Sequence, residues 1–541
     1  MMNSDRPVSV QEGKFGMVST ASSQATEAAV RVLKEGGNAV DAAVAAAFCL
    51  GVSEPQASGI GGQSMALVYL KEQDKMFALD GSSRAPFSLH PKKNPKKPIK
   101  FGLASSTVPS TVATLGYLQD YYGALTLKET LTPSIETARD GFTVTKLIAD
   151  MIEKERDHLV KDPSIVKNYF HTKKAPLQEG DLLVQPELAK TMERLAEEGW
   201  QDFYTGEIGD AIVRDMATRG GMITDVDMHQ IPLPVEREIL HSTYRGLDIY
   251  TYPPPGAGRV LVQILNTLEQ FAPEDLDPDE PLGAVILALA FRFALNYRKR
   301  MPMSPDHYLQ TTTNLLVDKG YAEEIAKRIR GIYDRALSDT FIPPPTSGET
   351  THLSVVDKDG NACGITQSIE LVFGSKTMAK DLGFFYNNYM SAFEYKDPAH
   401  PYYLLPGGRP WSSVAPLLIF EKKKPRYLLG SPGSARISTA LAQVITRLVD
   451  KGESLEDAIA APRFHASDEG DLLIEKRRFK EETLTALELA GFEMKKRGAY
   501  SFYLGCVQGV QLPIRWREPF IGVADPRRDG TAEGPDTIKQ G

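Results

Sequence analysis

The sequence predicts a protein of the α/β class, in which helices and strands mix along one chain of 541 residues. Residues 15–70 have the pattern of a strand, two helices, a glycine-rich loop and a further strand. Residues 105–340 are mainly helical in their spacing, and residues 349–370 give two β-branched runs around a turn. A chain of this length has room for several domains, but α/β folds of this size also form single units.

Two helices are predicted early in the chain. Ser22 or Ser23 can cap the first, which ends at a pair of glycines. Asn38 can cap the second, with Asp41 in its first turn. This second helix is almost entirely alanine and valine as far as Phe48, so we expect it to be buried on most sides.

The glycines at 59–62 invite comparison with a phosphate-binding loop. The Lys-Ser/Thr ending of such a loop is missing, and the segment leads into a strand at 65–70, which argues against nucleotide binding. We expect these glycines to allow close backbone packing instead. Further along, residues 133–138 and 188–199 show helical spacing, and the stretch at 253–258 is typical of a turn-rich loop.

Composition and charge argue against several classes of function. With 24% charged and 42% hydrophobic residues, the chain is typical of a soluble globular protein. Its net charge of -8 argues against a nucleic-acid or anionic-membrane binder. The start holds no apolar core of signal-peptide length, which points to the cytoplasm, although a leader removed from the sequence would leave the same pattern. The most apolar helical run, at 284–290, is too short for a membrane span.

The cysteines and histidines indicate neither a disulfide framework nor a metal site. The three cysteines, Cys49, Cys363 and Cys506, are widely spaced without a CxxC pair, so we expect buried thiols in a reducing compartment. The nine histidines form no HxxxH pair and no cluster with cysteine. The G-x-S-x-G elbow of serine hydrolases does not occur either. No metal or other cofactor is predicted.

The hairpin at 349–370 leaves two registers open. If its loop has three residues, Asp357 pairs with Asn361, and counting outward puts Thr350 opposite Ser368. A loop of two residues would shift that partner by one and turn Ser368 to the other face of the sheet. Only the first register brings the two hydroxyl groups together.

Thr350 has the layout of an N-terminal nucleophile. It begins a strand directly after the segment 341–348, which is too proline-rich to join a sheet and is predicted to be an exposed connector. A threonine hydroxyl needs a neighbouring base to attack at neutral pH. Cutting the chain before Thr350 would supply one, because a free α-amine has a pKa of about 8. The alternative is an ordinary surface hairpin, since Thr-Thr pairs are common in strands.

Motifs spread over most of the chain carry a family resemblance. The segment from Thr350 to Ala362 closely resembles the start of the small subunit of γ-glutamyltranspeptidases, N-terminal-nucleophile hydrolases that cut themselves before this threonine. Further matching motifs occur in the same order at residues 36–43, 54–62, 409–413, 430–436 and 524–527. The chain is identified as a divergent member of this family.

The resemblance implies a four-layer αββα sandwich of two stacked sheets between outer helices. It implies that residues 1–349 form a large subunit and residues 350–541 a small one, cut from one precursor and folded together as one αββα unit. A homodimer of such processed pairs stays open. The implied partner is a small-molecule amide, with no nucleic acid, membrane or cofactor.

The resemblance also implies roles for four catalytic residues. Thr350 Oγ1 attacks the substrate amide with its own α-amine as base, and Ser368 orients the hydroxyl. Gly433 and Ser434 fall on the family's paired glycines, whose N–H groups stabilise the oxyanion. A serine keeps that N–H donor if it tolerates the same backbone conformation.

The residues expected to bind the substrate depart from the family pattern. Ser82 replaces the arginine that binds the substrate carboxylate, and Arg84, two residues on, either binds the same carboxylate or is structural. Ala392 replaces the aspartate that holds the substrate's amino group. Glu370, at a position where the family often has asparagine, either supplies a displaced negative charge or merely lines the strand.

Other candidates keep their place in the family pattern. Ser412 and Ser413 fall on paired serines that contact the substrate carboxylate, and Tyr389 is a further candidate for substrate binding. The irregular stretch at 394–408 stands where the family has a lid, and 253–258 resembles a proline-rich loop near the active site.

Three functions stay open. The first is cleavage of γ-glutamyl amides such as glutathione through an acyl-Thr350 intermediate. The second is the same chemistry on another amide, as in the family's cephalosporin acylases and oxamate amidohydrolases, and Ala392 with Ser82 favours it. The third is an inactive scaffold, against which intact Thr350, Ser368 and Gly433 argue.

Overall fold

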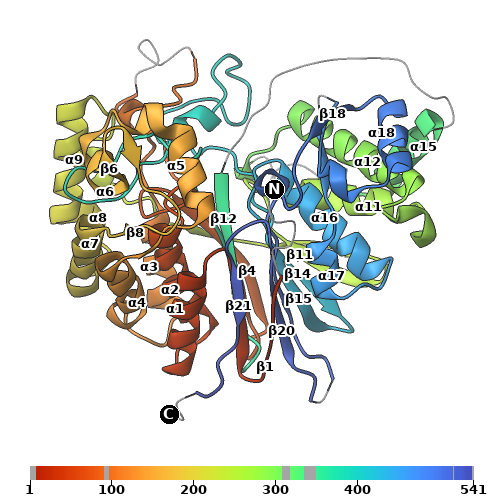
Figure 1. Ribbon diagram of the computed structural model, residues 1–541, viewed down its shortest axis with the longest axis horizontal. Helices are drawn as coiled ribbons and strands as arrows, with labels where there is room; N and C mark the ends of the chain where they lie inside the picture. Colours follow the sequence, from red (N-terminus) through yellow and green to blue (C-terminus); the bar gives the residue numbers. More distant parts are fainter. Residues whose placement is uncertain are drawn as a thin grey trace.

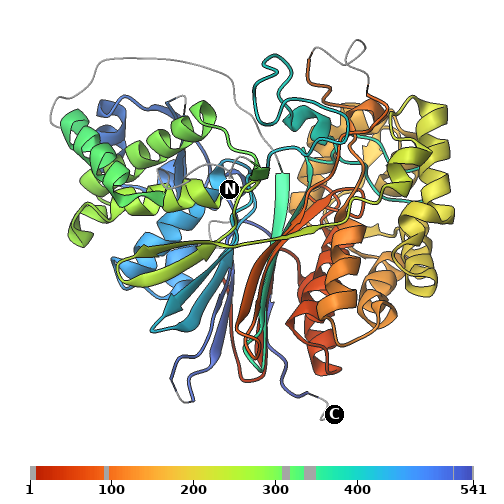
Figure 2. The same cartoon turned by 180° about the vertical axis from the view of Figure 1, so that it is seen from behind.

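The computed structural model describes residues 8–89, 97–306, 317–333, 349–468, 470–515 and 517–538. Two β-sheets stand next to each other in the centre, and one group of helices covers the outer face of each (Figure 1). The view from behind shows the same four layers (Figure 2). The predicted αββα sandwich is therefore confirmed. The connector expected at 341–348 lies outside the described residues.

Both central sheets have seven strands, and their neighbouring strands run antiparallel. The first has the order β1 (Ser9–Gly13), β20 (Phe520–Ala524), β19 (Gln508–Gln511), β15 (Lys424–Gly430), β14 (Leu417–Glu421), β11 (Leu247–Thr251), β10 (Leu240–Tyr244). The second has the order β21 (Thr531–Glu533), β2 (Gly16–Thr20), β12 (Glu349–Asp357), β13 (Ala362–Glu370), β3 (Gln63–Leu70), β4 (Lys75–Gly81), β9 (Val235–Arg237). Each sheet thus combines strands from before and after the Glu349–Thr350 bond.

The helices divide between the two outer layers (Figure 1). Outside the second sheet lie α1 (Ser23–Lys34), α2 (Ala39–Ser53), α3 (Thr111–Tyr122), α4 (Leu127–Asp140), α5 (Lys146–Leu159), α6 (Pro163–Tyr169), α7 (Pro186–Glu198), α8 (Asp202–Thr205), α9 (Glu207–Arg219) and α10 (Asp225–His229). Outside the first lie α11 (Gly258–Leu268), α12 (Pro281–Arg300), α15 (Lys319–Tyr333), α16 (Arg436–Val449), α17 (Leu455–Ala460) and α18 (Glu481–Leu489).

Short elements complete the chain. They are β16 (Phe464–Ala466), β17 (Asp471–Ile474) and β18 (Glu493–Lys496) in a three-stranded sheet, the ribbons β5 (Phe142–Thr143) with β8 (Leu182–Leu183) and β6 (Phe170–Thr172) with β7 (Ala175–Pro176), and 3₁₀ turns at Leu103–Ser105, Pro273–Leu276, Tyr389–Ala392, Lys476–Arg478 and Phe502–Leu504.

Apolar side chains fill the spaces between the layers. One large cluster joins the second sheet to its helices, and another joins the first sheet to its own. Between the two sheets, Leu67 and Val356 of the second meet Leu418 and Leu428 of the first. The two sheets therefore share one buried interface and pack as a single unit.

Local signals at the N-terminal helices gave correct predictions. Ser22 caps α1, and its Oγ accepts a hydrogen bond from the N–H of Ala25 at 3.3 Å. Asn38 caps α2 and forms a capping box with Asp41. Every residue of α2 is buried, because small side chains on all sides let it pack between the sheet and other helices.

The helical interpretation of residues 105–340 missed the hairpin of β10 and β11. Arg245 and Gly246, with φ angles of +50° and +80°, form its two-residue turn. Arg-Gly is a weaker hairpin signal than Asn-Gly or Asp-Gly, because arginine rarely adopts a positive φ. Pairing of β11 with β14 stabilises this hairpin, although its turn sequence only weakly favours one.

The hairpin of β12 and β13 follows the three-residue-loop register. The N–H of Asp357 donates to the carbonyl of Asn361 at 3.1 Å. The register shifts by one between Glu349 and Thr351, because Ser368 and Ile369 of β13 together face the single residue Thr350. The bulge is therefore in β13, directly opposite the predicted nucleophile.

Two further expectations concern the cysteines and the membrane. Cys49, Cys363 and Cys506 are buried and free of disulfides, which confirms their predicted burial. Within the part of the chain that the structure describes, no helix combines the length and apolar character needed to cross a membrane.

Candidate active site

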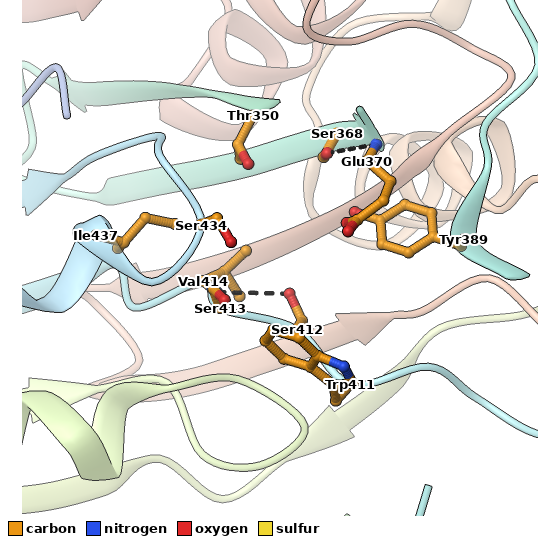
Figure 3. A pocket seen from close by; sticks show the side chains of 10 residues that line it. All are labelled: Thr350, Ser368, Glu370, Tyr389, Trp411, Ser412, Ser413, Val414, Ser434 and Ile437. Atoms are coloured by element: carbon orange, nitrogen blue, oxygen red, sulfur yellow. Dashed lines mark hydrogen bonds between the residues drawn. The ribbon is translucent and has the colours of Figure 1, made fainter. Parts of the chain in front are cut away.

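A pocket lies at the open end of the hairpin of β12 and β13. It is lined by Thr350, Ser368, Glu370, Tyr389, Trp411, Ser412, Ser413, Val414, Ser434 and Ile437. Seven of the nine predicted site residues line it, and Gly433 adjoins one of them. Thr350 and Ser434 lie on one side of the pocket, opposite Glu370 and Tyr389 (Figure 3).

Thr350 and Ser368 meet at the peptide bond that precedes Thr350. Thr350 is only 6% exposed, and its hydroxyl points toward the pocket (Figure 3). The hydroxyl of Ser368 donates to the carbonyl oxygen of Glu349 at 2.5 Å and accepts the N–H of Glu370 at 2.8 Å. In the uncut chain the Ser368 hydroxyl is thus hydrogen-bonded to the carbonyl that precedes Thr350.

Gly433 and Ser434 form the turn that leads into α16. Their φ angles are +123° and +54°, so Ser434 adopts the left-handed conformation, which costs an L-residue about 1 kcal/mol. The carbonyl oxygens of this pair accept the N–H groups of Arg436 and Ile437, both at 3.1 Å. Among the described residues, neither Gly433 nor Ser434 donates its own N–H to a backbone carbonyl.

Glu370 brings a titratable carboxyl group to the pocket. Its φ angle of +79° is unusual for a residue with a side chain, and it follows from the end of β13 turning into the pocket. Burial raises the pKa of Glu370 to about 7. Tyr389 lies beside it, and burial together with the nearby Glu370 raises the pKa of the Tyr389 phenol (Figure 3). The carboxyl group is thus poised to respond to a charged ligand at neutral pH.

Ser412 and Ser413 are held from behind by Arg298 of α12. The guanidinium donates to the carbonyl of Ser412 at 2.7 Å and lies 4.3 Å from the centre of the Trp411 ring. Ser412 in turn donates its N–H to the carbonyl of Pro255 at 3.1 Å. The proline-rich loop at 253–258 therefore lies against the site, as the resemblance implied.

Arg84 lies outside the wall of the pocket. Its backbone pairs with Val108, and burial and the nearby Arg409 lower the pKa of its guanidinium. The hydroxyl of Ser82 donates to Asp80 at 2.5 Å, so this serine is also turned away from any ligand. Of the two alternatives for Arg84, the structural one fits this position better.

Glycines at the start of the chain pack against the site. A Cβ atom on Gly62 would lie 2.3 Å from the carbonyl oxygen of Ser368, and one on Gly61 would lie 2.2 Å from that of Phe385. Any side chain would push the loop away from β13. The expectation of close backbone packing is confirmed.

Three apolar lining residues were missed by the sequence analysis. Trp411 and Val414 flank the paired serines, and Ile437 lies in the first turn of α16. Apolar residues at such positions look like ordinary core, so the sequence holds no signal that separates them from it. Ala392 is not among the lining residues, and 394–408 is irregular apart from an isolated bridge.

The arrangement can support acyl transfer through a hydroxyl nucleophile. It combines a hydroxyl at a strand end, a donor on the adjoining carbonyl and two N–H groups at a helix start. Within the described ranges, no group of three or more His, Cys, Asp or Glu side chains could hold a metal ion.

Comparison with known proteins agrees with this chemistry. A model of the gamma-glutamyltranspeptidase family matches residues 25–534. The glutathione hydrolase proenzyme of Escherichia coli (strain K12) is 34% identical over 95% of this chain and 90% of its own length. The Acylase ACY 1 proenzyme of Pseudomonas sp. (strain SE83) is 31% identical over 89% of this chain and 88% of its own.

Solved structures share the fold over the full length. The cephalosporin acylase from Bacillus halodurans superimposes with a TM-score of 0.85 at 27% identity, covering 99% of this chain and 98% of the acylase. The family match, the relatives and the pocket at Thr350 lead to one conclusion: the chain belongs to the γ-glutamyltranspeptidase family.

Proposed function

We propose that the chain is a self-cleaving threonine amidohydrolase that acts on γ-glutamyl amides such as glutathione through an acyl-Thr350 intermediate. One observation carries this proposal: the Ser368 hydroxyl donates a hydrogen bond to the carbonyl of the Glu349–Thr350 peptide bond, and Thr350 lines the pocket. Family membership and relatives named as glutathione hydrolases support the reaction class.

Self-cleavage begins when Thr350 Oγ1 attacks the carbonyl carbon of Glu349. An O–C bond forms, the C–N bond breaks, and the hydroxyl proton passes to the leaving nitrogen, which becomes the free α-amine of Thr350. Ser368 donates to the carbonyl oxygen as negative charge develops on it. Water then hydrolyses the ester, leaving a carboxylate on Glu349 and restoring the Thr350 hydroxyl. The products are residues 1–349 and 350–541.

Turnover uses the same hydroxyl on an external amide. The α-amine of Thr350 takes the proton from Oγ1 and later gives it to the leaving amine, since its pKa of about 8 suits both roles. The N–H groups of Gly433 and Ser434 stabilise the tetrahedral oxyanion. Water resolves the acyl-Thr350 in hydrolysis, and an amine acceptor resolves it in transfer.

Binding of the γ-glutamyl group falls to the opposite side of the pocket. Ser412 and Ser413 offer hydroxyl donors to the α-carboxylate, and Arg298 behind them adds positive charge. Glu370, beside Tyr389, offers a carboxylate to the α-ammonium. In this assignment Arg84 does not touch the substrate and affects its binding only through the electrostatic field of its positive charge.

A second candidate is the same reaction on an acyl group without an α-amino group. Ala392 brings no carboxylate and Ser82 is bound to Asp80, so two positions that contact the γ-glutamyl group in the family carry no charged side chain here. Similarity to a cephalosporin acylase and to Acylase ACY 1 supports this candidate as well.

Two chromogenic amides separate the candidates. γ-Glutamyl-p-nitroanilide and glutaryl-p-nitroanilide differ only in the α-amino group, and kcat/KM is measured for both with Thr350→Ala as the inactive control. We expect the γ-glutamyl amide to be preferred. A preference for the glutaryl amide would favour the second candidate. If the chain stays uncut and turns over neither amide, an inactive scaffold would be favoured.

A further inference from the structure

A buried ion network surrounds the bond proposed to be cut. Arg528, in the turn after β20, lies with Nη1 3.0 Å from Oε1 of Glu54 and with Nη2 3.5 Å from Oε2 of Glu349. The Glu54 carboxylate also accepts the hydroxyl of Thr351. One guanidinium thus connects, directly or through Glu54, the residues on both sides of Thr350.

This network is costly to bury. The side chains of Arg528, Glu349 and Glu54 are only 1%, 2% and 4% exposed. Two carboxyl groups share one guanidinium, and burial raises the pKa of both Glu54 and Glu349. Within the described structure, Oε1 of Glu349 and Nε of Arg528 have no hydrogen-bond partner. Incompletely paired buried charges are a poor source of stability, which points to a role for this network other than stabilising the fold.

The network acts on the backbone that must react. Ser368 binds the carbonyl oxygen of Glu349, and the nucleophile lies between two residues whose side chains are both held in the network. Attack by Thr350 Oγ1 on the preceding carbonyl needs that carbonyl held at a defined angle. Ser368 holds only the oxygen atom, whereas Arg528 and Glu54 hold the side chains of Glu349 and Thr351 on either side of Thr350, opposite the bulge in β13.

We propose that Arg528 is a positioning residue for self-cleavage, which holds Glu349 directly and Thr351 through Glu54 so that the carbonyl lies in the path of the Thr350 hydroxyl. The inference rests on the proposed self-cleavage, whose bond changes are those given above. Arg528 touches none of the reacting atoms.

Cleavage is measured by pulse–chase of the full chain made by cell-free synthesis, so that the uncut precursor is seen from the start. Arg528→Met removes the charge at similar length and is expected to slow cleavage about a hundredfold. Arg528→Lys keeps a charge that can hold one carboxylate and is expected to restore part of the rate. Glu349→Gln is expected to slow cleavage about tenfold, and less than additively with Arg528→Met.

Arg447→Met is the matched control. Arg447 is 3% exposed, pairs with Asp279 at 2.6 Å and Glu453 at 3.1 Å, and likewise has an unpartnered Nε, but it lies at the far end of α16. Its loss is expected to leave the cleavage rate within about twofold of the wild type, because positioning depends on contact with the cut bond and not on buried charge in general.

Thermal unfolding distinguishes a positioning role of Arg528 from a purely stabilising one. It is measured in a Thr350→Ala background, where no variant can cut itself. Arg528→Met and Arg447→Met are expected to lower the midpoint equally while differing in cleavage. Equal cleavage rates for Arg528→Met and the wild type would overturn the role of Arg528 but leave the proposed function intact. A wild type that never cuts itself would overturn the proposed function. If Arg528→Met fails to fold, a wild-type rate for Glu349→Gln overturns the inference.

Discussion

The two sides of the pocket differ in how closely they follow the family. On the reacting side, Thr350, Ser368 and the Gly433–Ser434 turn keep the hydroxyl, the carbonyl donor and the two N–H groups. On the binding side, Glu370 lines the pocket where the family often has asparagine, while Ala392, which stands where the family has a carboxylate, does not line it. We propose that the reaction machinery is retained, while some of the groups that select the acyl donor have changed.

The difference shows which part of the site carries information about the substrate. A nucleophile, a base and an oxyanion hole serve any amide, so their retention specifies only the reaction class. Specificity depends on groups that pair with the rest of the substrate, and an unpaired charge there costs several-fold in rate. Substitutions on the two sides should therefore have separable effects.

The largest effect is expected from Ser434→Pro on the reacting side. Proline removes the N–H donor and, with its φ fixed at about −65°, cannot keep the positive φ of +54°, so kcat should fall by at least the roughly 100- to 1,000-fold expected for one lost oxyanion donor. Ser434→Gly keeps the donor and relieves the positive φ of +54°, so it should retain near wild-type kcat. Both are measured on the two p-nitroanilides. A loss confined to one substrate would break the division between the two sides.

A smaller gain is expected from Ala392→Asp on the binding side. If the missing carboxylate limits recognition of the α-ammonium, restoring it should raise kcat/KM for γ-glutamyl-p-nitroanilide about tenfold, the value of one charged hydrogen bond. Glutaryl-p-nitroanilide, which has no ammonium, serves as the control substrate and should not gain. No gain for either substrate would mean that Glu370 already fills the role.

The smallest effect concerns the pH dependence of Glu370. With a pKa raised to about 7, its carboxylate is mostly protonated at pH 6 and mostly ionised at pH 8. The ratio of kcat/KM for the γ-glutamyl amide to that for the glutaryl amide should therefore rise several-fold over this range. Taking the ratio cancels the titration of the Thr350 amine. In Glu370→Gln the ratio should be flat, and a rise that persists there would assign the pH dependence to another group.

Local patterns predicted more of the fold than of the site. The caps at Ser22 and Asn38 and the burial of α2 depend on neighbours in the chain, and each was predicted correctly. The hairpin turn at Asp357 was predicted with two possible registers, and the structure has the three-residue loop. The order of strands was not predicted, because β1 pairs with β20 across almost the whole sequence. Such pairing leaves no local signal.

Predicting the site required the family resemblance as well as the local residue pattern. Thr350 and Ser368 lie in one hairpin, and counting along it brought them together. Ser434 comes from a distant turn and was found only through the family motif. The contact of Arg528 with Glu349 joins residues 179 positions apart, and neither local spacing nor the motifs pointed to it. Ion pairs formed by folding are visible only in the structure.

The most direct test of the central claim is the intact mass of the purified chain under denaturing conditions. We predict two polypeptides, residues 1–349 and 350–541, the second with a free N-terminal threonine, and one uncut polypeptide for Thr350→Ala. A wild-type chain that stays whole through long incubation would contradict the account, because without a free amine Thr350 has no base.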